Sequence, residues 1–281
     1  MKKYTEKDKI DATSTLRKAA KLYDEFYCNK KLLVIYNNPS KPFFVEITAS
    51  PTNFLHLTGL IINTVSLLRD VSDKNTNYKV VFYEKCLQNK LSIDDFDFDP
   101  KGDSERKLDV IISTLNPVQN AKMIGDYNGQ RIYFQSNTLM GNPNSFLALF
   151  KDEGGYFVPS SVMKGDIRND TYYTSRVLAI LSKKFDEPFY NEIKYVAKKI
   201  DIDKLLEVLK NDVSLSPNLL SSAQPNTDAA YSSAVNEDLR KKLERRAEII
   251  RSLEDENNQQ NTNASEPSQQ DCPDDDEDME W

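Results

Sequence analysis

Histidine is almost absent from this chain of 281 residues, in which His56 is the only one. A reaction that needs an imidazole near neutral pH must therefore use His56, because no other side chain has an ordinary pKa in that range. Cysteine is also scarce, and Cys28, Cys86 and Cys272 are far apart without metal-ligand spacing. This pattern argues against a disulfide framework and a zinc site, so we expect no metal, no cofactor and a reducing cytoplasm as the location.

Long apolar runs are missing as well. No segment approaches the ~18 consecutive apolar residues of a membrane helix. The charged start of the chain, residues 1–9, leads into no apolar core of a signal peptide. We therefore expect a soluble protein that is not exported and has no membrane partner.

Charge is unevenly divided along the chain. Residues 1–212 carry 31 Lys and Arg against 28 Asp and Glu, a net of +3, whereas residues 213–281 carry 6 against 16, a net of −10. Composition changes at the same point, from periodic segments to a stretch rich in Ser, Pro and Asn. We expect an α+β domain over 1–212, a linker over 213–235, an isolated or docking helix over 236–257, and a disordered acidic tail over 258–281.

Hydrophobic spacing predicts the elements of the body. Helical periodicity occurs over 10–28, 78–91, 104–115 and 187–210, and Asp201 to Asp203 should break the last of these before a final short helix. A β-hairpin is expected from the runs 32–36 and 43–48, further strands from 130–136, 145–151 and 155–159, and either a strand or a helix from 172–182. The predicted fold is α+β, with N-terminal helices followed by a small antiparallel sheet, then C-terminal helices and the acidic tail.

His56 lies in the segment Pro51–Leu60 and has two interpretations. In the functional one, it is a general acid or base in a cleft, Thr58 supplies a hydroxyl, and Gly59 allows close approach of a ligand. In the structural one, the flanking apolar residues form core and His56 is a capping or hydrogen-bonded side chain. The residues alone leave both open.

Two motifs carry a family resemblance. Residues 53–60, Asn-Phe-Leu-His-Leu-Thr-Gly-Leu, and residues 82–92, Phe-Tyr-Glu-Lys-Cys-Leu-Gln-Asn-Lys-Leu-Ser, resemble the paired motifs of the fourth family of phage-encoded BECR nucleases, a group that includes barnase, EndoU, colicin ribonuclease domains and RelE toxins. Residues 156–161 resemble the aromatic strand of that family. The resemblance covers about residues 10–185. It implies a compact α+β domain whose concave sheet face binds RNA, metal-independent phosphodiester cleavage, and action in the host cytoplasm.

The resemblance also suggests site residues. It carries His56 and Thr58 onto the first motif, Lys85 and Lys90 onto the second, and Ser160 onto the end of the aromatic strand. Cleavage by a ribose 2′-OH needs a base, an acid and cations that neutralise the growing charge on the phosphate. With Arg131, Arg168 and Arg176 as candidate cations on or beside predicted strands, we expect these roles: catalytic His56, Thr58, Ser160 and Arg176; substrate-binding Lys85, Lys90, Arg131 and Arg168. Ordinary surface charge is the alternative for each arginine.

The tail suggests a second class of function. Residues 274–280 are acidic and end at Trp281, which resembles the C-terminal tips of single-stranded DNA-binding proteins. The alternative function is a non-catalytic nucleic-acid-associated or anti-defence protein that docks a protein partner through this tail. A degraded nuclease fold, or a tail that only aids solubility, fits the same sequence. For both the nuclease and the non-catalytic binding protein, the expected partner is RNA or single-stranded nucleic acid.

Overall fold

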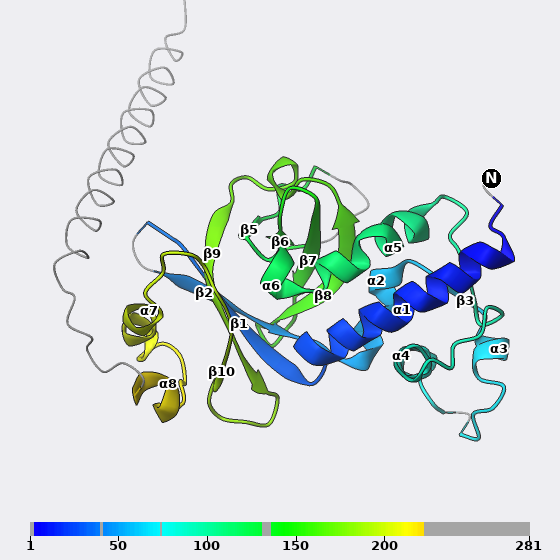
Figure 1. Cartoon of the computed structure of the whole chain (residues 1–281), viewed down its shortest axis with the longest axis horizontal. Coiled ribbons are helices and arrows are strands. Elements are labelled where there is room, and N and C mark those ends of the chain that lie inside the picture. Colours follow the sequence, from blue (N-terminus) through cyan, green and yellow to red (C-terminus); the bar gives the residue numbers. More distant parts are fainter. Residues whose placement is uncertain (1–2, 40–41, 74, 131–135, 222–281) are drawn as a thin grey trace, which may run out of the picture. The chain divides into compact units, whose positions relative to one another are not determined.

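The computed structural model describes residues 3–39, 42–73, 75–130 and 136–221. The expected helix over 236–257, the acidic tail and Arg131 lie outside the described residues. The compact body continues past Asp212, because Val213 and Leu215 are buried against α7 (Ile202–Leu209). A last described helix, α8 (Pro217–Ser221), follows them (Figure 1).

The main sheet closes on itself. Within the described ranges its strands are β1 (Lys30–Tyr36), β2 (Phe43–Thr48), β5 (Met123–Asp126), β6 (Thr138–Gly141), β7 (Ser145–Lys151), β8 (Phe157–Lys164), β9 (Ser175–Lys184) and β10 (Glu192–Val196). The first seven follow the order β1-β2-β8-β7-β6-β5-β9, and β9 pairs again with β1. They therefore form a closed seven-stranded barrel. The remaining strand, β10, pairs with β9.

The barrel corrects the predicted fold. A small antiparallel sheet with helices at both ends is wrong, because the sheet is closed and β2 runs parallel to β8 through the pair Ile47 and Phe157. Two of its strands, β5 and β6, are only four residues long, the lower limit for alternation that indicates a strand, and β6 is buried along its whole length and so shows no alternation. Closure also depends on pairing between β1 and β9, whose distance in sequence hides it from any local pattern.

Most of the expected local elements are confirmed. The helical patterns over 10–28, 78–91 and 104–115 correspond to α1 (Glu6–Phe26), α4 (Tyr78–Gln88) and α5 (Asp103–Thr114). The expected hairpin is β1 and β2, residues 145–151 are β7, residues 155–159 overlap the start of β8, and residues 172–182 overlap β9. The strand expected over 130–136 falls largely outside the described residues. The shorter elements are α2 (Pro51–Thr58), β3 (Ile61–Ile62), α3 (Thr64–Leu67), β4 (Phe96–Asp97), α6 (Pro117–Asn120) and the 3-10 turn η1 (Ile167–Asn169).

The helix expected over 187–210 is wrong in its first half. Strand β10 occupies that part and pairs with β9, with an irregular register between Ile193 and Tyr195. Pairing with a neighbouring strand overrides a helix-like spacing of apolar residues. Helix α7 begins only after Asp201, whose carboxylate accepts a hydrogen bond from the backbone N–H of Lys204 and so caps the helix.

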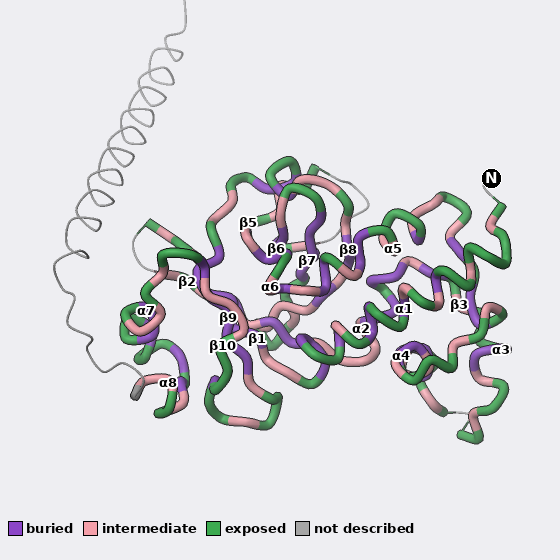
Figure 2. The backbone as a smooth tube through the Cα atoms, viewed as in Figure 1, coloured by how far each residue is buried: buried purple, intermediate pink, exposed green. Residues whose placement is uncertain are grey.

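The largest core joins the barrel to the N-terminal helices. Leu32, Ile47 and Leu147 of the strands belong to the same buried cluster as Leu16 of α1 and Phe54 of α2. Figure 2 shows buried stretches along the central strands of the barrel. Helices α2 and α5 both contact β8, and α2 also contacts α4. This packing brings α2, α4 and α5 together beside the barrel, where the candidate site lies.

Candidate active site

His56 projects from the short helix α2. Pro51 occupies the first turn, where a missing backbone N–H costs nothing, and the side chain of Asn53 accepts a hydrogen bond from the backbone N–H of Ser50. The helix buries its apolar side chains and leaves the imidazole of His56 exposed. The structure thus places His56 at the surface and its apolar neighbours in the core.

The imidazole opens onto a cleft of about 390 Å³. Two lysines from other helices reach it: the Nζ of Lys79 on α4 lies 3.0 Å from Nε2 of His56, and the Nζ of Lys107 on α5 donates to the backbone oxygen of His56 at 3.3 Å. We call this space the His56 cleft; it is lined by Leu55, His56, Gly59, Leu60, Ile62, Thr64, Tyr78, Lys79 and Lys107. It combines an imidazole, two ammonium groups and two hydroxyls.

The surroundings favour the neutral form of the imidazole. Partial burial lowers the pKa of His56 below its ordinary value, and the positive charges of Lys79 and Lys107 lower that pKa further. An ammonium group has no lone pair, so in this contact Lys79 donates and Nε2 accepts. His56 is therefore set up as a proton acceptor near neutral pH.

Gly59 sets the distance between α2 and α5. It ends α2 in the left-handed conformation, with φ of 67°. A Cβ atom there would lie 3.0 Å from Cδ of Lys107 and 3.2 Å from Oδ2 of Asp103. Asp103 also forms an ion pair with Lys107, with 3.3 Å between Oδ2 and Nζ. Gly59 therefore allows close approach of the chain's own α5, which positions Lys107 at the cleft.

Thr58 does not face the cleft. Its side chain is fully buried, and its Oγ1 donates to the backbone oxygen of Leu55 at 2.8 Å and accepts from the backbone N–H of Leu60 at 3.2 Å. Both bonds satisfy backbone groups at the end of α2. The structure gives Thr58 a local role in ending the helix.

The two lysines of the second motif lie elsewhere on α4 and beyond it. Lys85 forms an ion pair with Asp95, with 3.3 Å between Nζ and Oδ2, and the Asp95 side chain is only 2% exposed. That carboxylate also accepts hydrogen bonds from Ser66 and from the backbone of Ser92. Lys90 is exposed just after α4. Neither lysine lines the His56 cleft.

The remaining candidates are spread around the barrel. Ser160 on β8 donates to the backbone oxygen of Ala148 at 3.2 Å. Arg176 on β9 is exposed and donates to the backbone oxygen of Lys198 at 2.7 Å. Arg168 is held by Asp166, with its Nε 3.0 Å from Oδ1, and that carboxyl keeps the pKa of the guanidinium above its ordinary value. The structure does not bring these residues to the lining of the His56 cleft.

Four polar residues that line the cleft are not among the candidates expected from the sequence: Thr64, Tyr78, Lys79 and Lys107. Two of them carry a recognisable signal. Lys79 lies in the first turn of α4, two residues after its cap. That cap is Asn77, whose side-chain oxygen accepts a hydrogen bond from the backbone N–H of Lys79. Lys107 stands four residues after Asp103, the spacing of an ion pair on one helix face. These signals locate helix surfaces, but only the packing of three helices brings the lysines to His56.

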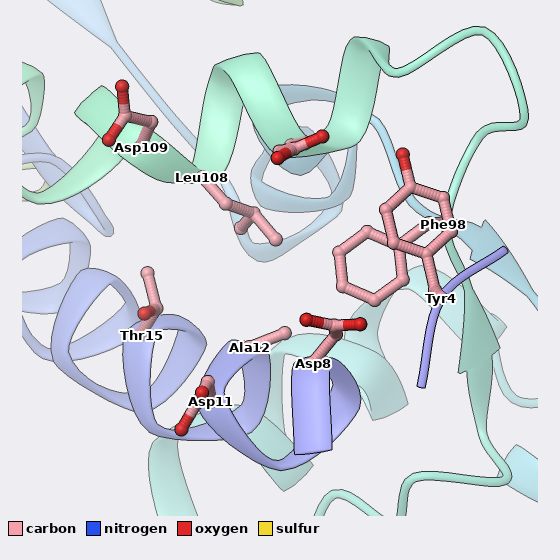
Figure 3. Close-up of a pocket in the computed structure, with 9 residues that line it drawn as sticks. Tyr4, Asp8, Asp11, Ala12, Thr15, Phe98, Leu108 and Asp109 are labelled. Carbon is pink, nitrogen blue, oxygen red and sulfur yellow. The ribbon is translucent and has the colours of Figure 1, made fainter. Parts of the chain in front are cut away.

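A second hollow lies between α1 and α5 and has the opposite charge. Asp8, Asp11 and Asp109 surround it, with Tyr4 and Phe98 stacked at one end with 4.2 Å between ring centroids (Figure 3). Its volume is about 250 Å³. Carboxylates repel phosphate, so this groove is unsuited to a nucleic-acid backbone. Among the described residues, no group of three or more His, Cys, Asp or Glu side chains is placed to hold a metal ion.

Comparison with protein families agrees with the motifs around His56. The sequence model of phage-Barnase-EndoU-ColicinE5/D-RelE like nuclease 4 matches residues 15–199, about two thirds of the chain. The chain belongs to this family. It is thus a phage nuclease of the BECR type, and the match includes α2, α4, α5 and the whole barrel.

Other comparisons add no relative. No curated protein matches the chain, and no solved structure matches it. As a separate finding, none of the helices in the described part of the chain is long and apolar enough to span a membrane.

Proposed function

We propose that this BECR nuclease cleaves RNA at the His56 cleft by acid–base chemistry that uses no metal ion. The observation that carries the proposal is the contact between Nε2 of His56 and Nζ of Lys79 at the mouth of an open, cationic cleft. A nuclease needs a proton acceptor and cations at the same phosphate, and both are present here.

In the proposed reaction, Nε2 of His56 takes the proton of a ribose 2′-OH. The 2′ oxygen attacks the adjacent phosphorus, the bond to the 5′ oxygen breaks, and the products are a 2′,3′-cyclic phosphate and a 5′-hydroxyl end. The phosphate draws the ammonium of Lys79 away from Nε2, which frees the lone pair that accepts the proton. Lys79 and Lys107 then neutralise the charge that grows on the phosphate oxygens.

The leaving oxygen needs a proton from a second group, since the single imidazole serves as the base. Tyr78 is our candidate, because its hydroxyl belongs to a side chain that lines the same cleft and is 36% exposed. Substitution Tyr78→Phe removes this hydroxyl and keeps the ring. If Tyr78 is the acid, the variant loses turnover on RNA but regains it on a substrate whose leaving group needs no proton.

The test uses the full chain and a panel of labelled RNAs in buffer with excess chelator. Wild type is expected to cut, with cyclic phosphate on the products. His56→Ala is expected to lose at least a hundredfold in rate, the low end of what general acid–base groups contribute. Lys79→Ala should lose about a hundredfold as well, as for the loss of one group that stabilises transition-state charge. Lys18→Ala, an exposed lysine on α1, is the control for lost charge. Equal cleavage by wild type and His56→Ala would refute the catalytic assignment, and cleavage that needs a divalent cation would refute the metal-free route.

A further inference from the structure

A strip of exposed aromatic and basic residues runs along the β9 side of the barrel. Tyr172 and Tyr173, each 72% exposed, precede β9, and exposed Arg176 lies at its start. Lys198 and Lys199 are exposed just after β10. We call these five residues the Tyr172–Lys199 surface; none of them lines the His56 cleft.

Hydrogen bonds and close backbone packing hold the parts of this surface together. The guanidinium of Arg176 reaches the backbone oxygen of Lys198 at 2.7 Å, which joins the β9 residues to the two lysines. The backbone N–H of Tyr172 donates to the oxygen of Asp126 on β5 at 3.2 Å. The backbone of Tyr173 lies against Gly125 on the same strand, where a Cβ atom would come within 2.2 Å of the Tyr173 oxygen. The two tyrosines are therefore fixed by their backbone while their rings remain exposed.

The charge of the surface is positive. It carries three cations, Arg176, Lys198 and Lys199. Two carboxylates belong to neighbouring segments and both are engaged: Asp126, whose backbone oxygen accepts from Tyr172, also accepts a hydrogen bond from Thr138, and Asp201, two residues after Lys199, caps α7. Lys199 has a positive φ of 64°, a backbone conformation that residues other than glycine rarely adopt. A positively charged surface beside exposed rings suits a polyanion whose bases can stack.

We propose that the Tyr172–Lys199 surface binds unpaired nucleotides of the RNA substrate, away from the scissile phosphate. This inference rests on the proposed function for its choice of RNA. Bases of a single strand can stack on Tyr172 and Tyr173, whereas the bases of a duplex are already stacked on each other. Arg176, Lys198 and Lys199 neutralise phosphates along the same strand. The surface therefore selects RNA with a single-stranded segment away from the cleavage site.

The test measures binding separately from cleavage, with the full chain carrying His56→Ala and a fluorescent single-stranded 12-nucleotide RNA. Replacing both tyrosines by Ala is expected to weaken binding about a hundredfold, roughly tenfold per stacked base. Replacing both by Phe keeps the rings and should keep most of the affinity. Phe150→Ala removes an exposed ring elsewhere and serves as the control.

A salt series tests the cations. Single-strand binding weakens with salt with a slope of about −0.7 per neutralised phosphate, so Lys198→Gln with Lys199→Gln should make the slope shallower by about 1.4. Lys18→Gln with Lys21→Gln on α1 is the matched control. Unchanged affinity in the tyrosine variants, or an equal loss for a duplex of the same length, would overturn the proposal.

The outcome is distinguishable from that of the proposed function. With His56 intact, the tyrosine variants should raise KM on single-stranded RNA and leave kcat unchanged, since they bind away from the reacting atoms. If wild type binds RNA through this surface but never cuts it, the catalytic proposal fails and the surface stands. If wild type cuts RNA and the tyrosine variants cut with the same KM, the surface proposal fails and the catalytic one stands.

Discussion

The ammonium of Lys79 lies 3.0 Å from Nε2 of the only histidine in the protein, His56, although the two residues belong to different helices. A protonated imidazole could not accept this contact and would face a second positive charge. The pair therefore ties the protonation state of His56 to the presence of Lys79. It also gives the cleft a cation that can move to a phosphate when one arrives.

Removing Lys79 should raise the pKa of His56. The order of causes that lower this pKa is burial, then Lys79, then Lys107, so Lys79→Met should shift it upward more than Lys107→Met does. Because the chain has one histidine, its imidazole C–H resonances report the titration without assignment to a residue. Lys18→Met should leave the curve unchanged. In a cleaving enzyme the acidic limb of kcat/KM should move to higher pH with the same variants, and a limb that stays in place would show that another group sets it.

The same pKa makes a prediction about stability. The folded state lowers the pKa of His56 below the value of about 6.5 for an unperturbed imidazole. Between the two values the unfolded chain binds more protons, so this contribution to stability is complete above pH 6.5 and is lost as the pH falls through the folded pKa. His56→Gln lacks this contribution. From pH 7.5 to pH 5.5, the urea midpoint should therefore fall further for wild type than for His56→Gln. Equal falls would contradict a lowered pKa in the folded state.

Gly59 offers a test of how the cleft is assembled. Gly59→Ala places a Cβ in a left-handed residue and against Lys107 and Asp103, so we expect it to destabilise the fold by about 1–3 kcal/mol and to lower activity by displacing Lys107. Gly129→Ala is the matched control, because Gly129 has a similar φ of 73° and open space around it. The difference between their free energies of unfolding isolates the contact from the backbone strain. If both variants lose the same stability and keep full activity, the approach of α5 does not depend on Gly59.

Local sequence patterns predicted the parts of this protein that depend on local physics. The helix α1 was expected from its apolar spacing, and the hairpin of β1 and β2 from two β-rich runs around a turn cluster. The barrel could not be predicted in this way, because β9 pairs with β1, which lies more than 140 residues earlier in the chain. Short strands such as β5 gain their conformation from their neighbours rather than from their own residues.

The candidate site shows the same contrast between what local sequence predicts and what tertiary packing decides. The single histidine and its flanking Leu-Thr-Gly single out the segment Pro51–Leu60, although they do not predict the helix α2 that forms there. The structure places His56 in a cationic cleft. Local sequence could not assign Lys79 and Lys107 to the site. Their sequence neighbours show only that they lie on helix surfaces, whereas α2, α4 and α5 meet through tertiary packing. Lys85 was chosen for its motif, yet its ammonium pairs with the buried Asp95. A motif marks residues without showing which of them stabilise the fold and which take part in the reaction.

Thr58 shows that ambiguity most clearly, because the resemblance in sequence makes it a candidate site residue and the structure buries its hydroxyl. Thr58→Val removes the bond to the Leu55 oxygen and leaves the buried backbone N–H of Leu60 without its acceptor. Loss of one partner from a buried polar pair costs about 1–3 kcal/mol, so the free energy of unfolding, measured by urea titration, should drop by that amount. Thr58→Ser keeps the hydroxyl and should lose less stability.

Because Oγ1 points away from the His56 cleft, kcat of folded Thr58→Val should stay within a few-fold of wild type at a temperature well below its unfolding. A loss of kcat comparable to that of His56→Ala, in a variant shown to be folded, would instead make Thr58 a catalytic residue and would require the end of α2 to rearrange when RNA binds.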